Sequence, residues 1–357
     1  MKNIVILHIG YVDSDKASGV NVAIPKMVHA QHKYANTLLL NLSNEYSDEL
    51  SVSYLQYACI QSLPSPFNKP TVVIFHEIYR KPFIKLSREC MRANIPYIII
   101  PHGGLTERAQ RIKAYKKIPA NLLVFRNFFR NAASIQYLSD SECNASIIKE
   151  KSFVCGNGVS VLNKPHLFRT GLGLRILFIG RYDIYFKGLD ILLDAITMIS
   201  SDMRKRNISL TLFGTGKPQD EKILKERIQQ GHLADIVKLN GPIFGDAKIS
   251  QYRSFDCFIQ TSRSEGQPLG VMEALSNGLP VIVTPGTTFT KEVTDNNMGI
   301  ACECNATSIS KAILHAATIQ DSFKIMSMNA IDFMKCNYDE EIIAQKAIGH
   351  YSLLIGS

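Results

Sequence analysis

The sequence lacks the features that mark several special classes of protein. No apolar run approaches the ~20 residues that span a bilayer, and the longest, such as residues 95–101, are short. No pair among the eight cysteines has C-x-x-C spacing, and eight in 357 residues are too few for a disulfide scaffold. Internal repeats and low-complexity tracts are missing as well. These absences exclude a membrane-spanning protein, a disulfide-rich miniprotein and a repeat fibre, and they favour free thiols in a reducing compartment.

The remaining composition is typical of a globular protein with two domains. The 357 residues are 46% hydrophobic and 20% charged, and domains usually hold about 100–200 residues. The opening stretch MKNIVILHIG has one lysine and no small-residue cleavage site behind it, so it resembles a first strand rather than a signal peptide. We therefore expect a soluble, cytoplasmic protein.

Positive charge is concentrated in the first half of the chain. Residues 1–165 carry a net charge of +9, and residues 166–357 carry none. Within residues 80–130, twelve lysines and arginines accompany two glutamates, with apolar and aromatic residues between them. This mixture suits an anionic membrane surface at the inner face of the cell membrane, and a solvated basic face is the alternative. Nucleic acid is not expected as a partner, because no nucleic-acid-binding motif accompanies the charge.

Short apolar runs alternate with amphipathic stretches along both halves. The first half predicts strands at 3–9, 36–41, 71–75, 96–101 and 134–138, and helices at 20–32, 82–92, 106–130 in pieces and 141–149. The pattern restarts after residues 157–159 with a strand at 174–180 and a helix at 188–200. We predict an α/β fold of two facing, doubly wound Rossmann-like domains with a central cleft. The domains are residues 1–165 and 166–340, and a helix at 341–357 is expected to pack back on the first.

The segment 261–280, TSRSEGQPLGVMEALSNGLP, carries two glutamates eight positions apart, Glu265 and Glu273. Pro268 is placed to open a helix, so Glu265 lies on the loop before it and Glu273 in its second turn. The amides around Leu269 and Gly270 would then form a helix N-terminus, which suits a phosphate group. Gly266 and Gly270 allow a ligand to approach the backbone closely. Taken alone, this pattern is more typical of a solvated helix with two surface glutamates.

Two cations follow the predicted strand 174–180, in the sequence GRYDIYFKG. Arg181 can make bidentate contacts to a phosphate, and Lys187 supplies a mobile point charge. A loop salt bridge is the structural alternative. The two elements together suggest a diphosphate site without a metal ion.

These two motifs resemble the signature of the retaining family-4 glycosyltransferases, which have the GT-B fold and a Glu-x7-Glu motif. The resemblance implies that Arg181 and Lys187 bind a nucleotide diphosphate, that Glu265 contacts the transferred sugar and that Glu273 contacts the ribose. It also implies nucleotide-sugar contacts from Gly266, Leu269 and Gly270, a metal-independent reaction and no cofactor. The resemblance further implies a donor sugar carried by UDP or GDP. It implies an acceptor that is a glycan or is linked to a lipid, as in O-antigen, lipopolysaccharide or capsule synthesis.

Two positions of the first half match the same family. Gly19 begins a helix after the first strand, although the family usually has Gly-Gly where this chain has Ser-Gly. His102, in Pro-His-Gly-Gly after the strand 96–101, would face the donor sugar across the cleft and act with Glu265 in catalysis. His76 is a weaker candidate for the acceptor side, and His8 is interpreted as structural.

Two other functions stay open at this point. The same scaffold serves sugar-nucleotide epimerases, which need no acceptor, and a basic binding protein could keep the fold without turnover. The triplet Asp13-Ser14-Asp15 is interpreted as a solvated loop rather than a metal site, and no His/Cys cluster has metal-ligand spacing.

Overall fold

A computed structural model describes residues 4–15, 18–162, 164, 166–169 and 173–355. The chain divides into a first unit, Met1–Gly158 with Glu340–Ser357, and a second unit, Val159–Asp339. The predicted boundary at Pro165 lies outside the described residues. The second unit begins earlier, because the Val159 N–H donates to the Tyr338 carbonyl at 2.9 Å and the Val159 side chain is buried among that unit's residues.

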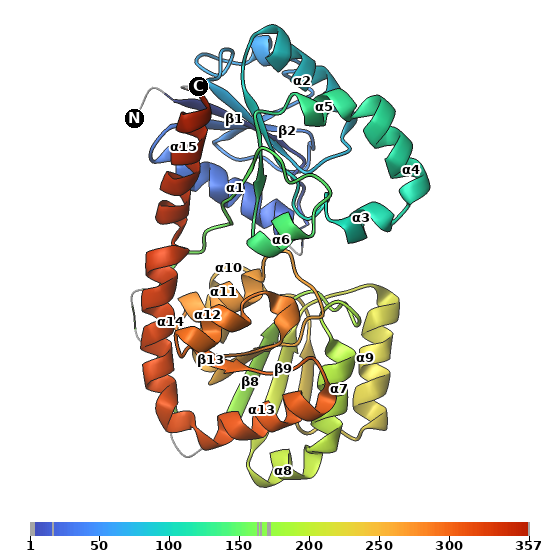
Figure 1. The fold of residues 1–357 in the computed structure, drawn as a ribbon. Coiled ribbons are helices and arrows are strands. Elements are labelled where there is room, and N and C mark those ends of the chain that lie inside the picture. Colours follow the sequence, from blue (N-terminus) through green and yellow to red (C-terminus); the bar gives the residue numbers. More distant parts are fainter. Residues whose placement is uncertain (1–3, 16–17, 163, 165, 170–172, 356–357) are drawn as a thin grey trace. The chain divides into compact units, whose positions relative to one another are not determined.

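The first unit contains one sheet of seven parallel strands in the order β3-β2-β1-β4-β5-β6-β7 (Figure 1). The central strands β1, β4 and β5 are buried along their whole length, which is why they read as continuous apolar runs. The strands are β1 (Val5–Gly10), β2 (Asn36–Asn41), β3 (Ser51–Ser53), β4 (Val72–His76), β5 (Tyr97–Ile100), β6 (Ser134–Tyr137) and β7 (Ser152–Val154).

Helices connect these strands, and the last helix of the chain returns to the first unit. Helix α15 packs beside α1, where Lys33 and Glu341 form an ion pair at 2.6 Å. The predicted helical region 106–130 is broken into pieces, because Lys113 adopts a left-handed conformation with φ 58°. The helices are α1 (Gly19–His32), α2 (Lys81–Arg92), α3 (Glu107–Arg111), α4 (Ala114–Pro119), α5 (Arg126–Arg130), α6 (Asp140–Asn144) and α15 (Glu340–Ile355), with short turns η1 (Ile60–Ser62) and η2 (Ala120–Val124).

The second unit contains six parallel strands in the order β10-β9-β8-β11-β12-β13. These are β8 (Leu174–Ile179), β9 (Ile208–Phe213), β10 (Val237–Asn240), β11 (Cys257–Gln260), β12 (Val281–Val283) and β13 (Gly299–Ala301). The helices and short turns are α7 (Leu189–Met198), α8 (Ser200–Lys205), α9 (Pro218–Gln230), α10 (Gly245–Ser254), α11 (Leu269–Ser276), η3 (Pro285–Thr287), α12 (Thr290–Asp295), α13 (Ala306–Thr318), η4 (Gln320–Ser322) and α14 (Phe323–Asn337). The predicted apolar stripe on α7 is confirmed, since Leu189, Leu192, Leu193 and Ile196 are buried.

Each sheet grows in both directions from a central strand. Strand β1 lies between β2 and β4, and β8 lies between β9 and β11. Ligands of such sheets bind outside the carboxyl ends of the strands, where the strand order reverses. The prediction of two doubly wound α/β units is confirmed, and the edges to examine are the carboxyl ends of β8 with β11 and of β1, β4 and β5. Of the helices in the described ranges, none is long and apolar enough to cross a membrane.

Candidate functional site

The loop after β8 brings Arg181 and Lys187 to the carboxyl end of the central strand. Gly188 ends this loop with φ 63°, and a Cβ there would lie 2.1 Å from the Thr261 carbonyl oxygen after β11. The close approach of the two loops therefore requires glycine. The Arg181 side chain is exposed and forms no hydrogen bond or ion pair with any residue that the structure describes. Its guanidinium is available to an anion.

Glu265 and Lys187 meet at this edge, as an ion pair of 2.5 Å between Nζ and Oε1. Gln260 Nε2 and Ser262 Oγ donate to the same oxygen at 2.9 and 2.5 Å. The side chains of Lys187 and Glu265 are 19% and 14% exposed, so the pair is largely screened from water. Because Oε1 takes three donors, Oε2 stays available to accept a hydrogen bond, and Lys187 retains two of its three donors.

Glu273 repeats this arrangement one turn inside α11. Lys248 Nζ lies 2.5 Å from Glu273 Oε2, and the Tyr252 hydroxyl donates to the same oxygen at 3.0 Å. Burial raises the pKa of Tyr252 well above its usual range, so this hydroxyl stays protonated and donates. Here too one carboxylate oxygen is held by the protein, and Oε1 has no partner among the described residues, so it can accept from a hydroxyl group.

The start of α11 differs from the prediction in one respect. Pro268 has φ −85° and ψ 70°, values typical of an inverse γ-turn, and the Leu269 N–H donates to the Gln267 carbonyl at 3.0 Å. The expectation of a free amide at Leu269 is therefore wrong. The predicted ends of this helix are confirmed, since α11 runs from Leu269 to Ser276 and Gly278 follows with φ 74°.

The two glycines of this segment have different surroundings. A Cβ added to Gly266 would meet nothing within 4 Å, whereas one added to Gly270 would lie 2.9 Å from Gln260 Oε1 and 3.3 Å from the Ile179 carbonyl oxygen. Packing within the protein therefore requires glycine at position 270 and leaves position 266 open to a ligand.

Gly270→Ala and Gly266→Ala are expected to act differently. Gly270→Ala should cost about 1–3 kcal/mol of unfolding free energy, because Gln260 must move away from Glu265. Gly266→Ala should leave stability within about 0.5 kcal/mol and weaken binding of a nucleotide sugar. Urea unfolding and calorimetric titration of both variants measure these effects. Equal stability losses at the two positions would contradict this assignment of the glycines.

In the first unit, His102 follows β5 and adopts a left-handed backbone with φ 47°. The next residue, Gly103, donates its N–H to Glu142 Oε1 at 2.5 Å, and Leu138 donates to Glu142 Oε2 at 2.8 Å. Glu142 is 2% exposed, and burial raises its pKa against the opposing effect of these two backbone donors. This carboxylate fixes the turn that places His102 at the carboxyl edge of the sheet, and the sequence analysis did not identify it.

The positions of the remaining candidates in the first half of the chain say less about their roles. Gly19 is the first residue of α1 after Ser18 and is exposed. The Asp13 side chain is bonded to Asn21 Nδ2, so the acidic triplet is tied to the start of α1. Across the described ranges, no group of three or more His, Cys, Asp or Glu side chains is arranged to hold a metal ion. Metal independence stays a prediction.

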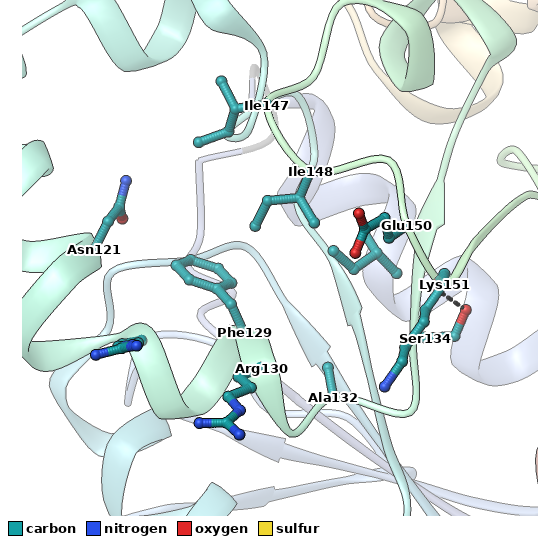
Figure 2. Close-up of a pocket in the computed structure, with 11 residues that line it drawn as sticks. Asn121, Phe129, Arg130, Ala132, Ser134, Ile147, Ile148, Glu150 and Lys151 are labelled. Atoms are coloured by element: carbon teal, nitrogen blue, oxygen red, sulfur yellow. Dashed lines mark hydrogen bonds between the residues drawn. The ribbon is translucent and has the colours of Figure 1, made fainter.

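The one open pocket that we describe lies elsewhere, at the amino ends of β6 and β7. It has a volume of about 410 Å³, and Figure 2 shows its lining side chains, with Phe129 at the centre. Arg126, Arg130 and Lys151 contribute cations, and Ile148 contributes apolar surface. This is the opposite edge of the sheet from His102, and none of the predicted site residues lines it.

Helix α4, labelled in Figure 1, and the following η2 carry an exposed apolar strip beside this pocket, and we call it the α4–η2 strip. Neither element has a buried residue. Its large apolar side chains are 48–82% exposed; they are Tyr115, Ile118, Leu122, Leu123 and Val124. Exposed apolar surface of this kind marks an interaction site.

Comparison with known proteins addresses the second unit directly. Residues 173–318 match the family model described as "Glycosyl transferases group 1". The match lies within the second unit, which is therefore similar to group 1 glycosyltransferase domains. Arg181, Lys187, Glu265 and Glu273 lie inside the matched region, whereas Gly19 and His102 lie outside it.

Curated relatives and solved structures extend the comparison. Phosphatidyl-myo-inositol mannosyltransferase of Mycobacterium leprae is 30% identical over 130 residues, which are 36% of this chain and 33% of that protein. Its Mycobacterium tuberculosis counterpart is 25% identical over 52% of this chain and 48% of its own length. The chain thus spans between a third and a half of these relatives.

The solved structures are similar over the whole chain. HepE of Anabaena, in complex with UDP, has a TM-score of 0.72 and 16% identity, covering 99% of this chain and 100% of its own. Sucrose-phosphate synthase of Thermosynechococcus elongatus has a TM-score of 0.73 and 16% identity over 99% of each chain. At these identities the likeness shows the fold, and the prediction of a GT-B glycosyltransferase fold is confirmed. Retention of configuration stays a prediction.

Proposed function

We propose that this protein is a retaining glycosyltransferase. It transfers a hexose-type sugar from a UDP or GDP sugar to a glycan or lipid-linked acceptor in cell-surface polysaccharide synthesis. The observation that carries the proposal is the Lys187–Glu265 pair at the carboxyl ends of β8 and β11, beside the free Arg181 guanidinium and inside the region similar to group 1 glycosyltransferases. These groups provide cations for a diphosphate and an acceptor for a sugar hydroxyl within one loop cluster.

The chemistry required of these residues follows from the bonds that change. The bond between the anomeric carbon and the phosphate oxygen breaks, and a bond to the acceptor oxygen forms on the same face of the sugar. The acceptor's proton passes to the departing phosphate oxygen, so charge and atoms balance without another base. Arg181, Lys187 and the N-terminus of α11 stabilise the negative charge that develops on the diphosphate. Glu265 Oε2 and His102 orient the oxocarbenium-like sugar.

The class of donor, a hexose carried by UDP or GDP, is proposed by analogy with similar proteins. The mycobacterial relatives are named as mannosyltransferases, and HepE was solved with UDP and with glucose. We assign Glu273 Oε1 to the ribose hydroxyls, because its position one turn inside α11 suits a group next to the diphosphate. Gly266 leaves room for the donor, Gly270 allows the close packing of α11 against Gln260, and we assign Gly19 to the same donor.

Turnover of nucleotide sugars tests this proposal. The protein is incubated with UDP- and GDP-hexoses in EDTA, with and without a lipid-linked glycan, and the released nucleotide and the anomeric configuration of the product are measured. We expect release from one nucleotide class and a product with the donor's configuration. A changed sugar that is still attached to its nucleotide would identify an epimerase instead. No turnover of any donor, with or without acceptor, would favour a binding protein.

We further propose that the first unit contacts an anionic membrane surface through residues 80–130. The exposed α4–η2 strip supplies apolar side chains, and the neighbouring pocket supplies Arg126, Arg130 and Lys151. Each cation contributes about 1 kcal/mol near an anionic surface, and apolar side chains add to this when they enter the interface. Such contact would bring a lipid-linked acceptor close to the enzyme.

Sedimentation with vesicles is expected to depend on this surface. Leu122→Asp/Leu123→Asp should lower the fraction bound to phosphatidylglycerol-containing vesicles at least tenfold, since burying each leucine contributes about 1.5 kcal/mol or more. Leu55→Asp is the matched control, because Leu55 is 75% exposed in the same unit but lies outside the segment. Equal binding of the double variant and the control, or equal binding to neutral vesicles, would refute the membrane contact.

A further inference from the structure

Three histidines of the first unit form a continuous chain of side chains. His8 lies in β1, His76 ends β4 and His102 follows β5, and these strands are neighbours in the sheet. His8 Nδ1 lies 3.0 Å from His76 Nε2, and His76 Nδ1 lies 3.1 Å from His102 Nε2. The rings of each pair are stacked, with centroids 5.2 and 5.4 Å apart. The chain runs from the middle of the sheet to the edge where His102 is exposed in part.

All three rings are neutral at physiological pH. Burial lowers the pKa of His8 and of His102 to about 4, and it lowers the pKa of His76 well below its usual value. A neutral imidazole has one nitrogen that donates and one that accepts. The three tautomers are therefore coupled. Where one ring donates a hydrogen bond, the facing nitrogen of its neighbour must accept it, so fixing one tautomer fixes the other two.

The contact of His8 with Gln31, at the buried end of the three histidines, determines which nitrogen of each ring carries the proton. His8 Nε2 lies 3.2 Å from Gln31 Oε1, a carbonyl oxygen that can only accept, so His8 carries its proton on Nε2. His8 Nδ1 then accepts from His76 Nε2, and His76 Nδ1 accepts from His102 Nε2. The proton of His102 is directed inward, and its Nδ1 keeps a lone pair without a partner among the residues described.

The orientation of the Gln31 amide rests on its contact with His8. Gln31 Oε1 lies 3.2 Å from His8 Nε2, and Gln31 Nε2 is buried without a hydrogen-bond partner among the described residues.

We propose that Gln31, His8 and His76 are positioning residues that fix His102 as its Nε2–H tautomer and present Nδ1 as an obligate hydrogen-bond acceptor. This inference rests on the proposed function in one respect, namely that His102 contacts the transferred sugar. An acceptor without charge selects a hydroxyl group, which can donate to it. A carboxylate oxygen has no proton to give and would meet another lone pair, so at the sugar position that Nδ1 faces the site takes a hydroxyl group and rejects a carboxylate.

The tautomer can be read without any substrate. In protein labelled with ¹⁵N-histidine at pH 7.5, two-bond correlations between ring nitrogens and carbons show which nitrogen of His102 is protonated. We expect the proton on Nε2 in the wild type. We expect a mixture of tautomers in His76→Leu and restoration of Nε2–H in His76→Asn, which keeps an acceptor near the former Nδ1. A proton on Nδ1 in the wild type, or an unchanged tautomer in His76→Leu, would overturn the proposal even if the protein proves to be a glycosyltransferase.

A control variant distinguishes an effect on the His102 tautomer from the general effect of removing a buried histidine ring. His166 is 5% exposed in the second unit, where its ring lies 4.4 Å from that of Phe168. His166→Leu should lower stability without changing the His102 signals. The wild-type spectrum remains decisive if His76→Leu fails to fold.

Substrate choice supplies the second readout. With UDP-glucose and UDP-glucuronate as probes, we expect the wild type to prefer the neutral sugar at least about 100-fold in kcat/KM. His76→Leu should reduce this preference about tenfold or more and leave the dissociation constant of free UDP unchanged. Absent turnover with these probes and with GDP-mannose and GDP-mannuronate would count against the proposed function and leave the tautomer measurement standing. Equal use of both probes by an active wild type would overturn the selectivity.

Discussion

Lys187→Met is expected to reduce kcat by about 10²–10³-fold, the largest effect of any single substitution that we predict. The change removes the cation that faces the departing diphosphate, and it leaves the Glu265 carboxylate, 14% exposed, without its ion-pair partner. Because Gln260 and Ser262 still donate to Glu265, the loop should keep its shape. Steady-state kinetics with the donor identified by turnover measures the loss.

Arg204→Met is the matched control for this substitution. Arg204 and Asp235 form a 2.7 Å ion pair in the same unit, but the two side chains are 40% and 55% exposed and lie far along the chain from the site. Exposed pairs of this kind contribute little to stability. We expect nearly unchanged kcat in Arg204→Met. A Lys187→Met enzyme with the activity of this control would show that Lys187 does not serve the diphosphate.

Acidification from pH 6.5 to pH 5 is expected to destabilise the first unit steeply. His8 and His102 have pKa values of about 4 in the folded protein and near 6.5 when unfolded, so the unfolded state binds more protons in this interval. Stability is therefore fully present above pH 6.5 and decreases as the pH falls toward 4. For His8 alone the complete loss is about 3 kcal/mol, at 1.36 kcal/mol for each unit of pKa.

Hydrogen exchange of the backbone amides in β1, β4 and β5 measures this loss of stability in the first unit. Most carboxylates titrate below pH 5, so the histidines dominate the interval from pH 6.5 to 5. Glu142 acts in the opposite sense, because burial raises its pKa and protonation then favours the folded state. The variant His8→Asn should be less stable at pH 7.5 but should depend less on pH below 6.5. Protection that stays constant between pH 7 and pH 5 would show that these histidines are not held neutral by burial.

The fold could be predicted from local patterns in the sequence. The Leu and Ile stripe of α7, the ends of α11 at Pro268 and Gly278, and the buried strands each follow from residues close together in the chain. Predictions were less accurate where a contact with a distant segment determines the end of an element. The predicted helix 141–149 ends at Asn144, because the chain turns there to pair Ser146 with Thr106.

The site could be predicted in part for the same reason. Arg181, Lys187, Glu265 and Glu273 stand in recognisable motifs, but the ion pair between Lys187 and Glu265 joins residues 78 positions apart. The histidine chain was missed because His8 and His76 become neighbours of His102 only through the strand order β1-β4-β5. Glu142 gave one signal, its place in a capping box after Ser139, whose hydroxyl accepts from the Glu142 N–H at 3.1 Å. Its bond to Gly103 could not be predicted from that motif.

Calorimetric titration of UDP and GDP in the presence of EDTA tests the donor site most directly. We predict that one of the two nucleotides binds without a metal ion. We also predict that Arg181→Ala weakens its affinity at least tenfold, since hydrogen bonds to a charged group contribute about 1.5–3 kcal/mol. Binding that requires a divalent cation, equal affinity of the wild type and Arg181→Ala, or no binding of either nucleotide would contradict a metal-free diphosphate site at the carboxyl end of β8.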